Sequence, residues 1–116
     1  MPVITVATAP HPAERELLVA IADAAADALG LAAGDVIAMT MPVRTTVANG
    51  QSSDAAAGAW MLVSIHGSDR GADGTRRACD AVRAAAADWS RRHAAEREND
   101  ADLEGVWCEW LLPEHP

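Results

Sequence analysis

The amino-acid sequence predicts an α/β (α+β) fold: two consecutive βαβ units form one four-stranded mixed sheet, with both helices on one face. The order strand–helix–strand expected for residues 2–47 is repeated in residues 59–112. Each expected helix joins two strands as a crossover, which predicts parallel pairing within each unit. The length fits a single domain that spans residues 1–116.

The first unit is expected to open with a strand over residues 2–8, which are rich in β-branched side chains. Apolar residues then recur at helical spacing over residues 13–29, and Gly30 follows as a natural helix stop. A second strand is expected over residues 36–41. Its apolar and polar residues alternate only weakly, which predicts that both of its faces are covered.

The second unit follows a polar loop over residues 48–58. A strand is expected over residues 60–65, then a glycine-rich turn over residues 66–74 and a long helix over residues 75–97. The last strand is expected over residues 106–112. The sheet face away from the helices would carry Val, Ile, Met and Trp with nothing in the chain to cover it, which predicts an oligomer.

Composition narrows the classes of function. The net charge is −8 and lysine is absent, which argues against binding to nucleic acid or to an anionic membrane surface. No apolar run is as long as a membrane span, and the start lacks the features of a secretory signal, so a cytoplasmic location is expected. Cys79 and Cys108 lack metal-ligand spacing and are expected to be buried thiols.

Three sequence features point to a known family: Pro2 follows the initiator methionine and opens a strand, residues 62–71 read LVSIHGSDRG, and residues 106–110 read VWCEW. These features resemble the tautomerase superfamily. Together with the doubled βαβ unit, they are similar to 4-oxalocrotonate tautomerase, macrophage migration inhibitory factor and the cis-3-chloroacrylic acid dehalogenases. The resemblance covers essentially the whole chain. It implies a homotrimer whose sheets face inward as a barrel, a small-molecule substrate, and no cofactor or metal.

The resemblance implies that Pro2 is the catalytic base. A free N-terminal proline is a secondary amine, and an ordinary α-amino group titrates near ~8. An apolar pocket and nearby arginines both disfavour the ammonium form, which leaves an amine able to move a proton beside a carbonyl. This role requires the removal of Met1. The alternative is a proline that only opens a strand.

Two arginines and one apolar residue are candidates for substrate binding. Arg70 lies in the glycine-rich turn before a helix and could hold a carboxylate in a bidentate fork; the alternative is a solvated loop arginine. Arg44 follows the second strand and could reach a neighbouring subunit's site, with a structural role as the alternative. Ile65, at the end of the expected strand over residues 60–65, is the apolar candidate. His66, which follows it, and His93 are both expected to be structural.

The last strand supplies two further candidates. Trp107 could form a pocket wall, and Glu109 could be a general acid or water activator, because a carboxylate in so apolar a strand needs a partner if it is buried. The alternative is that the alternation of side chains along the strand simply turns Glu109 outward. Compared with the dehalogenase-like members, Asp73 replaces a second arginine, and Leu111 and Leu112 stand where those enzymes carry a water-activating Glu.

The leading functional hypothesis is a keto–enol tautomerase that acts on a small carbonyl or 2-oxo acid substrate. A hydratase or dehalogenase acting on an unsaturated carboxylic acid is the alternative within enzymes. A non-catalytic trimer that serves as a binding or structural module is the alternative in another class.

Overall fold

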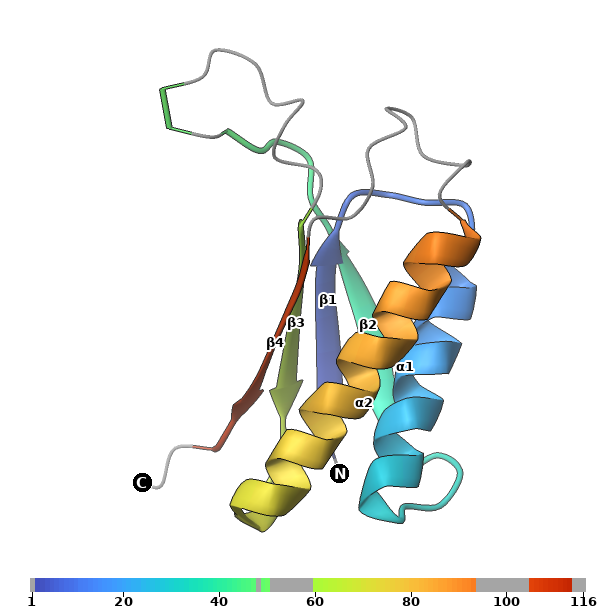
Figure 1. Ribbon diagram of the computed structural model, residues 1–116, viewed down its shortest axis with the longest axis vertical. Helices are drawn as coiled ribbons and strands as arrows, with labels where there is room; N and C mark the ends of the chain where they lie inside the picture. The colour runs from blue at the N-terminus through green and yellow to red at the C-terminus, as the bar shows by residue number, and fades with distance from the viewer. Residues whose placement is uncertain (1, 48, 51–59, 94–104, 114–116) are drawn as a thin grey trace.

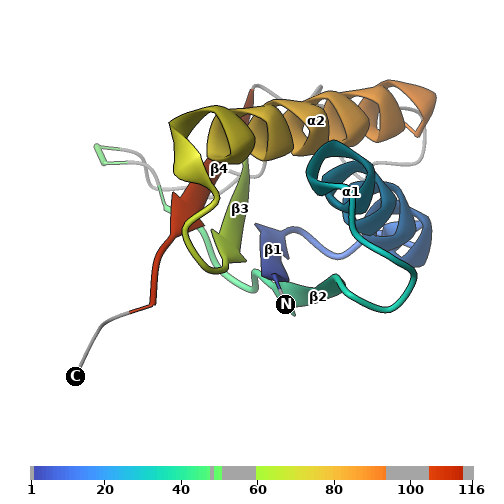
Figure 2. The ribbon, with the colours of Figure 1, turned by 90° about the horizontal axis from the view of Figure 1, so that it is seen from below.

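The computed structural model describes residues 2–47, 49–50, 60–93 and 105–113. Its elements follow in the order β1 (Val3–Thr8), α1 (Glu14–Leu29), β2 (Ile37–Pro42), β3 (Trp60–His66), α2 (Gly71–Arg92) and β4 (Gly105–Leu111). The strands lie in the order β2-β1-β3-β4. β1 and β2 pair in parallel, as do β3 and β4, whereas β1 and β3 are antiparallel. Both helices cover one face of the sheet, so the predicted fold class is confirmed (Figure 1, Figure 2).

The second helix differs most from its expected bounds. It begins at Gly71, inside the segment predicted to be a turn, and ends at Arg92 instead of residue 97. Gly71 has a φ of 73°, and its N–H donates to Oδ1 of Asp69 at 2.8 Å. Asp73 lies in the first turn, where the helix dipole favours an anion. These local contacts allow the helix to begin four residues earlier than apolar periodicity alone suggests.

The first helix ends as its sequence predicts. Gly30 takes the left-handed conformation at the C-cap with a φ of 67°, and its N–H bonds to the carbonyl groups of Ala26 and Asp27. The prediction that β2 is covered on both faces is wrong for a single chain. β2 is an edge strand, and Ile37, Met39 and Met41 are exposed on one of its faces.

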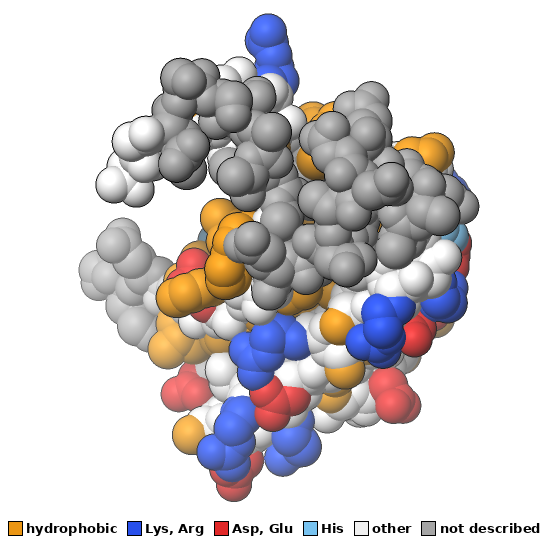
Figure 3. All heavy atoms as spheres, turned by 45° about the horizontal axis from the view of Figure 1, so that its top comes forward, with side chains coloured by type: hydrophobic (Ala, Val, Ile, Leu, Met, Phe, Trp, Pro, Cys, Tyr) orange, Lys and Arg blue, Asp and Glu red, His pale blue; other side chains and the backbone are white. Residues whose placement is uncertain are grey.

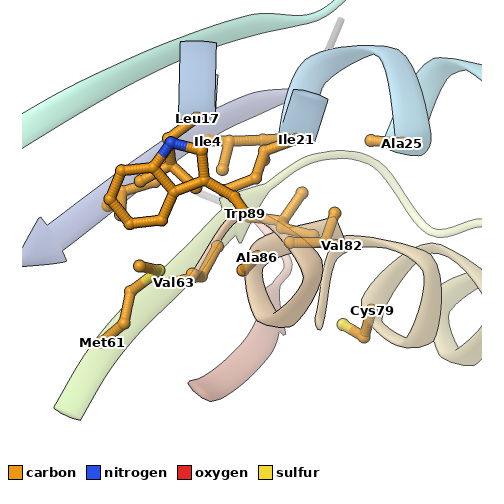
Figure 4. Packing of buried hydrophobic residues seen from close by; sticks show 12 residues of the cluster. Ile4, Leu17, Ile21, Ala25, Met61, Val63, Cys79, Val82, Ala86 and Trp89 are labelled. Carbon is orange, nitrogen blue, oxygen red and sulfur yellow. The ribbon is translucent and has the colours of Figure 1, made fainter. Parts of the chain in front are cut away.

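The hydrophobic core lies between the helices and one face of the sheet (Figure 4). The strands supply Ile4, Val6, Met61, Val63 and Ile65, and the helices supply Leu17, Ile21, Ala25, Cys79, Val82, Ala86 and Trp89. Burial of these apolar side chains is the main stabilising contribution to the fold. The largest of them also makes a polar contact, since Nε1 of Trp89 donates to the carbonyl oxygen of Ala13 at 3.1 Å.

The outer surface of the helices is polar. Basic and acidic side chains are interspersed over this face (Figure 3), and several pair along α2, as Arg76 does with Asp73. Between the helices, Glu16 contacts both Arg92 and His93, the latter at 3.0 Å. His93 therefore has the structural partner expected for it. No helix in the described parts of the chain is long and apolar enough to cross a membrane.

The other face of the sheet is apolar, and no described element covers it. We call it the open face. Residues at matching registers alternate onto it from all four strands: Val3, Thr5, Ala7, Ile37, Met39, Met41, Trp60, Leu62, Ser64, His66, Gly105, Trp107, Glu109 and Leu111. Its large apolar side chains include Trp107, which is 61% exposed, and Leu62, which is 52% exposed. The exposed apolar face expected from the sequence is therefore present.

Candidate active site

Pro2 lies at the end of the sheet where β1 begins and β3 and β4 end (Figure 2). Its side chain is fully buried, and its carbonyl oxygen accepts the N–H of Ile37 at 3.1 Å. Val3 pairs with His66, the last residue of β3, so the turn that follows β3 lies beside Pro2. A main-chain hydrogen bond from β2 therefore holds Pro2, and β3 pairs with the next residue, Val3. Met1, whose removal the proposed chemistry requires, lies outside the described residues.

Arg70 is brought to the same end of the sheet. It follows β3 by four residues and takes the N-cap position of α2. Its Nε atom is buried and has no hydrogen-bond partner in the described parts of the chain. Other arginines of α2 differ in this respect, because Arg76 and Arg83 bond to acidic side chains one helical turn away. Arg70 is thus a cation with a buried donor still unsatisfied, which fits a missing anionic or carbonyl ligand.

Trp110 is a residue of this region that the sequence did not single out. On the helix side of β4, its ring covers Gly67, where an added Cβ would lie 2.7 Å from Cζ2 of the indole. Its Nε1 is buried and also lacks a partner among the described residues. The signal available in the sequence was the alternation of VWCEW, which turns Trp107 and Trp110 to opposite faces.

Two hollows lie near this end of the molecule. One of about 300 Å³ is lined by Trp110, Leu112 and the first turns of α2, and its charged side chains are Asp69 and Arg76. The other, of about 620 Å³, lies along α1 and the loop before β2, and its charged side chains are Asp23 and Asp27. Because these are both carboxylates, the second hollow does not suit an anionic substrate.

Trp107 and Glu109 lie on the open face, directly opposite Leu62 and Ser64 of β3. Pro2 alternates onto the other face, with the core residues Ile4 and Val6. One copy of the chain therefore does not bring Trp107 or Glu109 to its own Pro2.

The remaining two candidates differ in position, because Ile65 pairs with Ile4 on the same sheet face as Pro2, whereas Arg44 lies far from it. Ile65 packs in the core with a fully buried side chain, so only its main chain could touch a ligand. Arg44 is exposed beyond β2, where the N–H of the preceding Val43 bonds to the carbonyl oxygen of Thr8. This is the opposite end of β1 from Pro2, ~20 Å away at the usual rise of a strand.

The cysteines are free thiols, Cys79 buried and Cys108 partly buried. Burial, followed by the neighbouring Cys79, raises the pKa of Cys108 to about 12. A thiol with so high a pKa is protonated at neutral pH and does not act as a nucleophile. Within the described ranges, no group of three or more His, Cys, Asp or Glu side chains could hold a metal ion.

Comparison with solved structures identifies the class of fold. A structure described as native fused 4-OT matches at 19% identity over 96% of this chain and 86% of its own, with a TM-score of 0.69. A structure described as the Q0 fused 4-OT symmetric trimer also matches at 19% identity, over 98% of this chain and 85% of its own, with a TM-score of 0.62. Malonate semialdehyde decarboxylase matches at 14% identity (96% and 84% coverage, TM-score 0.61), and macrophage migration inhibitory factor from Toxoplasma gondii at 20% (97% and 88%, TM-score 0.57).

The chain thus has the fold of the tautomerase superfamily, as its motifs predicted. Proteins with this fold include tautomerases, a decarboxylase with hydratase activity, and macrophage migration inhibitory factor. No protein-family model and no curated protein matches the sequence. At these identities the likeness shows the fold, and the chemistry has to be argued from the residues of this chain.

Proposed function

We propose that this protein is a cofactor-independent keto–enol tautomerase that acts on a small carbonyl or 2-oxo acid, with Pro2 as its general base. One observation carries the proposal. A fully buried Pro2 and an Arg70 with an unsatisfied buried donor lie at the same end of the sheet. This placement joins a candidate base to a candidate anion-binding group.

The reaction follows from these two groups. After Met1 is removed, the Pro2 nitrogen is a secondary amine, and burial together with a guanidinium at the same end of the sheet would disfavour its charged form. The amine takes a proton from the carbon beside a carbonyl, and the electron pair of that C–H bond moves toward the carbonyl oxygen to form an enolate. Return of the proton to the oxygen gives the enol. Arg70 holds the substrate carboxylate or stabilises the charge that develops on the oxygen.

In this proposal, Trp107 and Glu109 line the active site of a neighbouring copy of the chain. Because they lie on the sheet face opposite to Pro2, they can line a Pro2 pocket only in an assembly that uses the open face. We therefore include a homotrimer in the proposal, and the description of the fused 4-OT structure as a symmetric trimer supports it. Arg44, at the far end of its own sheet, would likewise serve the site of another copy. Ile65 would contact substrate through its main chain.

Intact mass and one kinetic assay test the proposal. Mass spectrometry should show a chain that begins at Pro2, and the purified protein should catalyse ketonisation of phenylenolpyruvate. Pro2→Ala should then lower kcat by about 100-fold or more, the usual range for loss of a general base. Pro10→Ala, at an exposed proline after β1, is the matched control and should be unaffected.

The possible outcomes separate the alternatives. Retained Met1, or equal rates for wild type and Pro2→Ala, would overturn Pro2 as the base. No turnover by a correctly processed wild-type protein would favour a non-catalytic binding module.

A hydratase is the second candidate, because malonate semialdehyde decarboxylase is described with hydratase activity and Glu109 is an exposed carboxylate able to activate water. Glu109→Gln should abolish hydration of an unsaturated acid and spare tautomerisation if this second activity exists.

A further inference from the structure

Three polar side chains interrupt the apolar open face where β3 and β4 pair. Ser64 lies directly opposite Glu109, and His66 lies opposite Leu111, two residues farther along. We call Ser64, His66 and Glu109 the polar cluster. At the usual strand rise and spacing, the Cα atoms of His66 and Glu109 are roughly 8 Å apart on the diagonal. Their side chains project to the same face, so they can reach each other.

His66 and Glu109 are the ionisable members of this face. The other open-face residues that the structure describes are apolar or are the uncharged Thr5, Ser64 and Gly105. Glu109 is flanked along β4 by Trp107 and Leu111. The helices pack on the other face, so the sheet separates their charges, such as those of Arg83 and Asp80, from the cluster.

In the single chain, His66 and Glu109 are exposed and water solvates them. Among the described residues, neither forms an ion pair or side-chain hydrogen bond. Covering the open face would remove that water. A carboxylate that loses its water must either become neutral or gain hydrogen bonds and an opposite charge. The Ser64 hydroxyl can donate one such bond, and protonated His66 is the described cation of this face within reach.

We propose that assembly of this protein through its open face is coupled to protonation of His66, which pairs with Glu109 when another copy covers the cluster. The inference rests on the homotrimer of the proposed function. It adds a proton-linked contact that the apolar face alone does not contain.

The sign of the coupling follows from the pair. A histidine ordinarily titrates near ~6.5 and a glutamate near ~4.3. A pair of opposite charges favours the protonated imidazole and the ionised carboxylate. The stabilisation from such a pair is therefore fully present between these two ordinary values. It is lost at higher pH, where the imidazole gives up its proton, and at lower pH, where the carboxylate gains one.

Sedimentation velocity over a range of concentrations measures the effect between about pH 5.5 and about pH 8.5, on either side of the ordinary histidine pKa. Above that pKa, the association constant should fall by up to about tenfold per pH unit for each pair, the limit for one linked proton. His66→Asn and Glu109→Gln should each remove this slope. Asp27→Asn, which neutralises an exposed carboxylate on α1, should keep it.

Each other result has a distinct meaning. An oligomer with no pH dependence, or with the same slope in His66→Asn, would overturn the coupling and leave the trimer intact. A slope that survives His66→Asn and disappears in Glu109→Gln would show that Glu109 is buried as a neutral acid, which also overturns the pair. A protein that is monomeric under all these conditions would instead overturn the trimer of the proposed function. Far-UV circular dichroism checks that each variant is folded.

Discussion

The indole ring of Trp110 lies over Gly67, so close that a Cβ at position 67 would be 2.7 Å from Cζ2 of the ring. Real Cβ atoms do not approach other carbons so closely, so any larger residue at 67 must displace the tryptophan. Gly67 directly follows β3, and its N–H bonds to the carbonyl oxygen of Leu111 at 3.1 Å. The contact therefore fixes the end of the β3–β4 pair beside Pro2.

Gly67→Ala should lower the free energy of unfolding by about 1–3 kcal/mol, the usual cost of overpacking. Trp110→Leu removes the ring that the new methyl group meets. In that background the alanine should cost clearly less, with a coupling of about 0.5–3 kcal/mol. Urea denaturation of the two single variants and the double variant measures this coupling. Additive effects would show that the ring and the glycine do not constrain each other.

The Trp110–Gly67 contact illustrates what the sequence can and cannot predict. Alternation in residues 106–110 correctly turns Trp107 outward and Trp110 inward. Which residue the inward ring covers depends on the register between β3 and β4, and register depends on contacts between segments far apart in the sequence. The strands, helices and sheet class follow from local periodicity, whereas this contact does not.

The candidate site shows the same division between what local sequence patterns predict and what depends on how distant segments pair. Residue order places Pro2 and Arg70 at strand ends, and the antiparallel pairing of β1 with β3 then brings those ends together. Local sequence signals give no such guide for Ile65 and Arg44, because a core position and the far end of a strand are defined only in three dimensions. The position of Glu109 across the sheet from Pro2 likewise emerges only from the pairing.

Cys108 should be almost inert toward alkylation in the folded protein. Its pKa of about 12, compared with an ordinary value of 9.0, leaves about a thousandfold less thiolate at mildly alkaline pH, and thiolate is the reactive form. Iodoacetamide labelling followed by peptide mass spectrometry, with and without denaturant, measures the two rates at this site. Labelling of the native protein as fast as that of the unfolded chain would contradict the buried position of the thiol.

The contact of Glu16 with Arg92 should make stability depend on acid pH. The hydrogen bond from Arg92 is the largest cause that lowers the pKa of Glu16 below 4.5, and the charge of His93 adds to it. Since the folded-state pKa is lowered, the contribution is present above 4.5 and is lost as the pH falls through the lowered value. Melting temperatures of wild type and Glu16→Gln should therefore differ near neutral pH and converge in acid.

Glu14→Gln is the matched control for that comparison. It removes a carboxylate from the same first turn of α1, so the effect on the helix dipole is similar. This substitution leaves the contact between Glu16 and Arg92 in place. Added salt should reduce the Glu16 difference, because both partners are exposed. If both variants shift the melting temperature equally at every pH, the ion pair contributes nothing beyond the dipole.

Arg70→Ala should lower kcat/KM by about 10- to 150-fold for a substrate that carries a carboxylate, which corresponds to the ~1.5–3 kcal/mol of a hydrogen bond to a charged group. Arg70→Lys should recover only part of the loss, because an ammonium keeps the charge but lacks the planar fork. Arg77→Ala is the control, since Arg77 is an exposed arginine in the first turns of the same helix. A neutral ketone substrate should be much less affected by Arg70→Ala. Equal losses for Arg70→Ala and Arg77→Ala would instead point to a general change in the charge of the α2 N-terminus, and no loss would remove Arg70 from the site.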